Sequence, residues 1–196
     1  MPFPLDSICK DTIINYFKKR KIGFDENSLI EVLKSSTKKY DIYWAVIGLR
    51  DVGTEKCIPY LRALRNFPMQ DVKDCLLLTI SHIAGEKETN FYVSVLQEKG
   101  TKKDYPMWAI KDSANEQAIN PVIEYLLSLL KKFRRPQFNY YGSSYIDGLI
   151  YLSKYKSTDT RIKEIFDNFI EIQGRLPQGA KETLKNNVEY FKERIR

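Results

Sequence analysis

Apolar residues recur at three- and four-residue spacing along most of the chain, and isolated glycines interrupt this pattern. The stretch 44–64 shows it most clearly. Two apolar stripes run through it: the first begins just before it, at Ile42, and continues with Val46, Leu49 and Val52, and the second is Cys57, Ile58, Leu61 and Leu64. Gly53 lies between the stripes and predicts that the first helix ends there in a left-handed cap. Pro59 suits the first turn of the second helix, where a missing N–H costs little. The stretch therefore predicts two helices joined by a short turn.

The same pattern returns along the chain at a period of about 31 residues. Gly85 lies 32 residues after Gly53, and Pro121 lies 62 residues after Pro59. In the later unit Asn115 takes the place of the glycine, and asparagine is the next best residue for a left-handed cap. No stretch alternates with a period of two, so no strand is predicted. We therefore predict an all-α fold, an α-α superhelix of about five helical pairs.

The helical pairs predict a single helical-repeat domain over residues 1–196. An N-terminal pair over 1–40 has one helix over 6–21 and a short one after Asn27. The repeats follow over 41–172, with an insertion at 134–143 that breaks the period by about ten residues. Residues 178–196 form an amphipathic helix whose polar side suits the exposed end of an open stack.

The residues around the Gly53 turn resemble a known repeat family. They are Gly53, Lys56, Cys57, Ile58, Pro59, Leu61 and Leu64. This pattern resembles HEAT-like repeats of the short kind called PBS-lyase-like. At the level of fold, residues 41–172 also resemble small helical-repeat immunity proteins of bacteria, which bind and block a toxin domain encoded beside them. The resemblance implies a non-enzymatic protein-binding module, an immunity protein that neutralises a cognate toxin domain.

Composition and net charge indicate where the protein is located and which kind of partner it binds. Hydrophobic residues make up 43% and charged residues 29% of the chain, as in ordinary soluble globular proteins. No apolar run approaches the ~18 residues that a membrane span needs, and the N-terminus lacks the apolar core of a signal peptide. We therefore expect a cytoplasmic protein. The net charge of +7 favours an acidic partner, which for an immunity protein implies a toxin with an acidic or mixed surface, and leaves nucleic acid possible.

The residue types that usually carry catalysis or bind metals are scattered. His82 is the single histidine, and the three cysteines are Cys9, Cys57 and Cys75. No pair of them has the spacing of a zinc site, and the glycines do not form a phosphate-binding loop. We expect no cofactor, no metal and no catalytic residue. The cysteines are predicted to be buried reduced thiols.

Basic residues recur where the second helices of the pairs end. These candidates for partner binding are Arg62, Arg65, Lys102, Lys103, Arg134 and Arg135. In a stack of repeats such positions align along one edge. The competing explanation is that cations at helix C-termini offset the helix dipole.

Aromatic residues concentrate in and after the insertion. The partner-binding candidates among them are Phe138, Tyr140, Tyr141 and Tyr145, because tyrosine beside arginine is typical of binding hot spots. The alternative is that these rings fold back and fill the groove between the last two pairs.

Two other functions stay open. Some HEAT-like proteins are alkylbase DNA glycosylases with a tryptophan-lined cleft and a catalytic aspartate, and Trp108 with Asp112 one turn later resembles such a pair. The competing reading is that Trp44 and Trp108 pack between repeats. Other possibilities are a nucleic-acid-binding HEAT-like protein and a scaffold subunit of a larger assembly.

Overall fold

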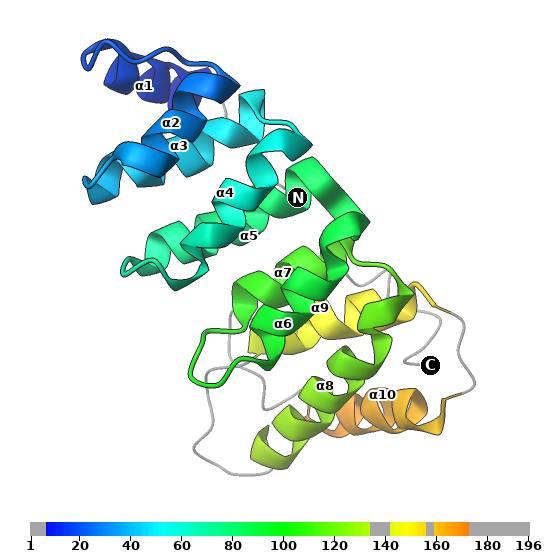
Figure 1. Cartoon of the computed structure of the whole chain (residues 1–196). Coiled ribbons are helices and arrows are strands. Elements are labelled where there is room, and N and C mark those ends of the chain that lie inside the picture. Colours follow the sequence, from blue (N-terminus) through cyan, green and yellow to red (C-terminus); the bar gives the residue numbers. More distant parts are fainter. Residues whose placement is uncertain (1–6, 134–141, 156–158, 173–196) are drawn as a thin grey trace. The chain divides into compact units, whose positions relative to one another are not determined.

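The computed structural model describes residues 7–133, 142–155 and 159–172, and within these ranges the chain is helical with no strand (Figure 1). The all-α prediction is confirmed for this part of the chain. The chain divides into two compact units, Met1–Glu88 and Thr89–Arg196, here called unit 1 and unit 2. In the described ranges no helix combines the length and the apolar character that crossing a membrane requires.

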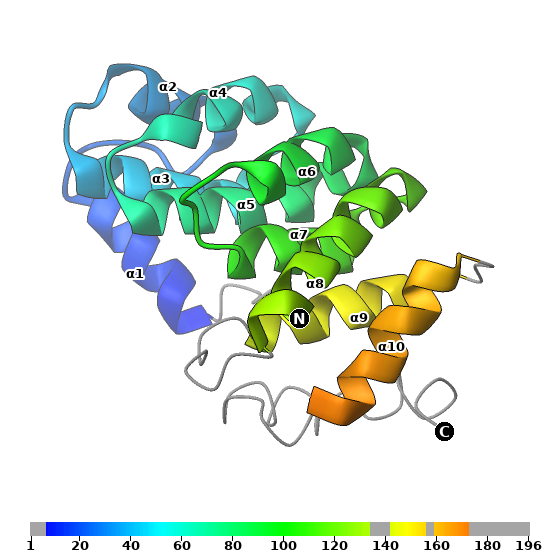
Figure 2. The ribbon, with the colours of Figure 1, turned by 90° about the horizontal axis from the view of Figure 1, so that it is seen from below.

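Unit 1 consists of two layers of helices. Its helices are α1 (Ser7–Lys18), α2 (Glu26–Ser35), α3 (Lys39–Val52), α4 (Ile58–Ala63) and α5 (Gln70–Ala84). Helix α3 packs against α1, α2 and α5, while α4 packs against α2 and α5. In Figure 2, α2 and α4 lie side by side in one layer, and α1, α3 and α5 form the other. Single turns of 3-10 helix precede and follow α4, namely η1 (Glu55–Cys57) and η2 (Leu64–Asn66), and a third, η3 (Gly85–Glu88), follows α5.

The turn between α3 and α4 follows the predicted order of elements, but Gly53 acts differently from the expectation. Its backbone is extended, with φ −81° and ψ 150°, so the predicted left-handed cap is wrong. Glycine is needed here for space: a Cβ would lie 2.4 Å from the carbonyl oxygen of Leu49 and 3.0 Å from Cys57 Sγ. Thr54 then caps η1 by accepting a hydrogen bond from the N–H of Lys56 at 3.3 Å, and Pro59 lies in the first turn of α4 as predicted.

The two later positions aligned with Gly53 differ from each other. Gly85 ends α5 as predicted, with φ +55° and ψ −132°, so its φ is positive but its backbone is not in the left-handed helical region. Asn115 has φ −86° and ψ −173°, so its predicted left-handed cap is wrong. It begins the next helix instead, because its side chain accepts a hydrogen bond from the N–H of Gln117 at 3.1 Å. Asn115 therefore caps the N-terminus of η4 as Thr54 caps that of η1.

Unit 2 repeats the two-layer arrangement. Its described helices are α6 (Thr89–Gln97), α7 (Asp104–Ser113), the single turn η4 (Glu116–Ala118), α8 (Ile119–Phe133), α9 (Gly142–Ser153) and α10 (Thr160–Ile172). Helices α7 and α9 pack together, and α8 packs against α6, α9 and α10. Pro106 lies in the first turn of α7, as predicted.

Tyrosines fix α9 in the core of unit 2. Tyr145 and Tyr151 are fully buried. The Tyr145 hydroxyl donates to the carbonyl of Ile165 at 3.1 Å, and the Tyr151 hydroxyl donates to the carbonyl of Asn115 at 2.5 Å. Because a buried phenol needs a partner, these bonds fix where α9 lies relative to η4 and α10.

Several expected boundaries move by a few residues. The first helix ends at Lys18, and α2 is capped by Asp25, one residue before its first residue Glu26. Residues 134–141 of the predicted insertion and the predicted capping helix 178–196 lie outside the described residues. The single repeat domain over 1–196 stays a prediction.

Candidate functional site

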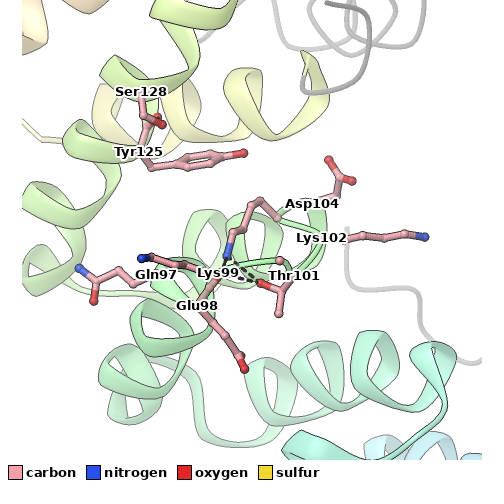
Figure 3. A pocket seen from close by; sticks show the side chains of 10 residues that line it. Gln97, Glu98, Lys99, Thr101, Lys102, Asp104, Tyr125 and Ser128 are labelled. Atoms are coloured by element: carbon pink, nitrogen blue, oxygen red, sulfur yellow. Dashed lines mark hydrogen bonds between the residues drawn. The ribbon is translucent and has the colours of Figure 1, made fainter.

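A surface pocket of about 430 Å³ lies in unit 2 where α6 ends (Figure 3). Its lining residues are Gln97, Glu98, Lys99, Gly100, Thr101, Lys102, Lys103, Asp104, Tyr125 and Ser128. One wall is the connection from α6 to α7, and the other is the side of α8 that bears Tyr125 and Ser128. The pocket thus includes Lys102 and Lys103, two of the residues predicted to bind a partner.

The α6–α7 connection folds back over the end of α6. Gly100 has φ +78°, a left-handed conformation that glycine adopts without strain. The Thr101 hydroxyl donates to the carbonyls of Glu98 at 3.1 Å and Val95 at 3.4 Å. These bonds satisfy carbonyls that the end of a helix leaves without partners. The connection is therefore held in a defined shape.

Lys103 supports this turn from within. Its ammonium donates to the Val95 carbonyl at 3.2 Å, to Thr101 Oγ1 at 2.7 Å and to the Glu98 carbonyl. Partial burial lowers the pKa of Lys103, although the Glu98 charge acts in the opposite direction. At this residue the competing explanation holds: the cation stabilises the C-terminal end of a helix.

Lys99 and Lys102 differ from Lys103. Both side chains are exposed, and neither forms an ion pair within the described ranges. Figure 3 shows Lys102 extending outward from the connection, with Tyr125 and Ser128 across the pocket from Thr101. Glu98 and Asp104 also line the pocket, so its rim carries both signs of charge.

Tyr125 provides the aromatic surface of the pocket. It is half-buried, and its hydroxyl forms a hydrogen bond of 2.8 Å with Ser144 Oγ on α9. The ring is therefore held in place while part of it stays accessible. A fixed tyrosine beside exposed lysines can pack against a partner's side chain while the lysines bind its carboxylates.

The other predicted basic residues are placed separately. Arg62 and Arg65 lie in α4 and η2 of unit 1, and Lys102 and Lys103 lie in unit 2. Arg62 binds the buried carboxylate of Glu88. Arg134 and Arg135 lie outside the described residues, so the alignment of all six residues along one edge stays a prediction.

Of the four aromatic residues predicted to bind a partner, the structure describes only Tyr145. Phe138, Tyr140 and Tyr141 lie outside the described residues. Tyr145 is fully buried in the core, where its hydroxyl bonds to Ile165. A side chain without exposed surface offers no contact to a partner of the folded chain, so Tyr145 does not belong to the candidate site.

Trp108 and Asp112, the pair that resembles a glycosylase site, lie on the same side of α7 as a lysine. The ammonium of Lys111 lies 3.6 Å from Asp112 Oδ1, 5.5 Å from the centre of the Trp108 ring and 3.1 Å from Asp147 Oδ1. Burial raises the pKa of Asp147, against the opposing effect of Lys111. Lys111 thus offsets the charge of both carboxylates, and Trp108 stacks on Tyr105 with ring centres 6.2 Å apart.

The histidine and the cysteines do not form a metal site in the part of the chain that the structure describes. Within the described ranges, no group of three or more histidine, cysteine, aspartate or glutamate side chains has the geometry to hold a metal ion. Cys57 is buried as predicted, whereas Cys9 and Cys75 are half-buried, and none of the three forms a disulfide. Burial raises the pKa of Cys57 and of Cys75 to about 11, so both stay protonated at neutral pH.

Sequence reasoning missed two contributors to the pocket. Lys99 was not among the predicted partner-binding residues, and Tyr125 was hidden within the apolar stripe of α8. Only the packing of α8 beside the α6–α7 connection brings the two together. No periodic signal in the sequence marks that contact.

Comparison of the chain with models of protein families, with curated proteins and with solved structures yields no match.

Proposed function

We propose that this chain is a non-enzymatic protein-binding module, an immunity protein that binds and neutralises a cognate bacterial toxin domain. In this proposal the helices form an α-α superhelix of about five HEAT-like pairs. The helical layers of both units and the repeated motif around Gly53 support the fold part of the proposal. A repeat scaffold of this kind suits binding, because its side chains are held on rigid helices and short turns.

The pocket at the end of α6 is the observation that carries the proposal. Its two exposed lysines are on the α6–α7 connection, which internal hydrogen bonds hold in place. The half-buried Tyr125 on α8 lines the same pocket. Little conformational entropy is lost when such a preformed site binds. Tyrosine is also enriched among the residues that dominate interface energies.

The charges of the pocket indicate the kind of partner. Lys99 and Lys102 are available for carboxylates, while Glu98 and Asp104 lie on the same rim. A surface of mixed sign with an excess of acidic groups complements this arrangement best. The net charge of +7 favours the same partner and speeds its association.

The insertion remains part of the proposal on sequence grounds alone. Arg134, Arg135, Phe138, Tyr140 and Tyr141 combine the residue types that dominate interfaces, and insertions in repeat proteins often fall on the binding face. We propose that they add contacts to the same partner.

Co-expression tests this function. The reading frame next to this gene is expressed alone and together with this chain, and growth of the host is measured. We expect growth arrest by the neighbouring protein alone, and rescue by the wild-type chain with which it co-purifies. The double variant Lys99→Glu/Lys102→Glu should rescue less well. Arrest that the wild-type chain does not relieve, or the absence of a complex, would contradict the proposal.

A further inference from the structure

Two basic segments of unit 1 lie next to each other on its surface. The first is the end of α1 with its following turn, which carries Lys18, Lys19, Arg20 and Lys21. The second is the N-cap and the first residue of α3, Lys38 and Lys39. All six side chains are exposed, and together they are here called the basic patch. Tyr40 follows directly and is 65% exposed, the one exposed large hydrophobic residue found in the described ranges.

Asp41 connects the two segments. Its Oδ1 accepts hydrogen bonds from the Tyr16 hydroxyl at 2.5 Å and from Arg20 Nε at 3.1 Å, and its Oδ2 accepts from Ser36 Oγ at 3.2 Å. The guanidinium carbon of Arg20 also lies 3.6 Å from the centre of the Tyr16 ring. Burial and the bond to Asp41 raise the pKa of Tyr16 to about 12, so its phenol is a donor at neutral pH. The end of α1 is thus fixed against the residues that precede and begin α3.

Arg20 is paired with Asp41, but the five lysines of the patch are not paired with acids among the described residues. Within the described ranges, no ion pair involves Lys18, Lys19, Lys21, Lys38 or Lys39, and Asp41 is buried beneath Arg20. Elsewhere in unit 1, lysines do pair with acids, as Lys10 does with Asp51 at 2.6 Å. Apart from Arg20, the patch therefore consists of lysines that form no ion pair with the described residues.

One cation of the patch is kept at a conformational cost. Lys21 has φ +58°, in the left-handed region that glycine prefers. The N–H of Lys21 bonds to Lys18 O at 3.0 Å, and the N–H of Ile22 bonds to Phe17 O at 3.1 Å. These bonds define the helix-ending turn in which glycine is most common at the place of Lys21. A lysine there adds a charge where a glycine would fit better.

We infer that the basic patch, together with Tyr40, binds single-stranded nucleic acid. The exposed charges of the patch are all positive, unlike those of the pocket rim, and nucleic-acid interfaces are strongly positive and contact phosphates through lysine and arginine. An exposed tyrosine beside such cations can stack on an unpaired base while the lysines follow the backbone. The patch lies outside the pocket residues, so this activity is additional to the proposed binding of a toxin domain.

Fluorescence anisotropy with the full chain tests the inference. The probe is a labelled single strand of about 20 nucleotides, made as RNA and as DNA. Four phosphate contacts predict a slope of log affinity against log salt of about −3 for a single strand. The variant Lys18→Gln/Lys19→Gln/Lys38→Gln/Lys39→Gln should weaken binding at least about tenfold and remove most of that slope.

Two matched controls separate the patch from net charge. The variant Lys56→Gln/Lys87→Gln/Lys131→Gln/Lys163→Gln removes the same charge from exposed lysines outside both the patch and the pocket, and should change affinity less than about threefold. Tyr40→Ala should weaken binding about tenfold, while Tyr40→Phe keeps the ring and the affinity.

Three outcomes would overturn the inference. They are equal losses in the two fourfold variants, an unchanged affinity in Tyr40→Ala, and tighter binding of poly-glutamate or of anionic lipid vesicles than of the oligonucleotide. None of these variants changes a residue of the pocket, so failure here leaves the toxin-binding proposal untouched.

Discussion

The guanidinium of Arg62 on α4 binds the buried carboxylate of Glu88 through two hydrogen bonds, from Nε to Oε2 at 2.7 Å and from Nη2 to Oε1. Glu88 ends the single turn η3, just as Cys57 ends η1 and Ala118 ends η4, and all three residues are buried. The glutamate occupies a place that small side chains fill in the other turns. Arg62 therefore offsets a charge that the position would otherwise disfavour.

Arg62→Ala should lower the free energy of unfolding by about 2 kcal/mol, because it leaves Glu88 buried without its cation. The arginine is 49% exposed, so water moderates the loss. The double variant Arg62→Ala/Glu88→Ala should recover at least half of it, since alanine suits this position in η4. Urea denaturation of the wild type, both single variants and the double variant measures the coupling. A double variant less stable than Arg62→Ala would refute this account.

Gly53→Ala should destabilise unit 1 by about 2 kcal/mol or more, because the new Cβ meets a backbone carbonyl that cannot move away. Gly148→Ala is the matched control: the nearest atom to its Cβ is the end of a leucine side chain, Leu126 Cδ2, at 2.8 Å. A leucine can change rotamer, so we expect a smaller loss there. Thermal unfolding of both variants tests the difference, and an equal effect would show that Gly53 is not needed for space.

Lys21→Gly should raise the free energy of unfolding by about 1 kcal/mol, because glycine removes the strain of the positive φ. Lys18→Gly is the control with the same loss of charge. Lys18 is the last residue of α1, where glycine should instead lower stability. If Lys21→Gly also weakens oligonucleotide binding, stability and charge compete at this residue. A destabilised Lys21→Gly would show that the turn carries no strain.

Helical periodicity predicted most of the elements, because packing one face of each helix determines where the apolar residues fall. It did not predict the backbone conformation at Gly53. Glycine serves either where φ is positive or where a Cβ would clash, and the two needs look alike in a sequence. Asn115 is similar, because asparagine is common both at the end and at the beginning of helices. Only its hydrogen bond with the N–H of Gln117 shows that it begins one here.

The candidate site was predicted less well than the fold. A cation after a helix end can either be exposed to solvent or bind the last carbonyls of the helix. Lys102 is exposed, whereas its neighbour Lys103 binds the carbonyl of Val95. Tyr145 belongs to an aromatic-rich stretch, but which side of α9 faces the core depends on contacts distant in the sequence. The pairing of Arg20 with Asp41, 21 residues away, likewise has no local signal.

Stability should depend on pH through Asp147. Burial raises the pKa of this carboxyl in the folded chain above its unfolded value, so the folded state holds the proton more tightly. The stabilisation from the protonated form is complete below the unfolded pKa and is lost as pH rises through the folded pKa. We therefore expect the wild type to lose stability relative to Asp147→Asn as pH increases from about 3 to 7.

Urea denaturation at several pH values measures this difference. Asp25→Asn serves as the control of opposite sign: hydrogen bonds from Ser28 lower the pKa of Asp25, so the wild type should gain stability over this variant as pH rises. A wild type that gains stability over Asp147→Asn with rising pH would mean that Lys111 outweighs burial at this site.

The most direct test of the proposed function is the dissociation constant of the complex between this chain and the toxin domain that co-expression identifies. Lys99→Glu/Lys102→Glu places two acids beside the pocket and should raise the dissociation constant at least about a hundredfold, because like charges then face the acidic partner. Lys38→Glu/Lys39→Glu changes the net charge equally in unit 1 and should raise it less than about tenfold. Equal effects of the two variants, or a complex that Lys99→Glu/Lys102→Glu leaves unchanged, would contradict the claim that the pocket at the end of α6 binds the toxin.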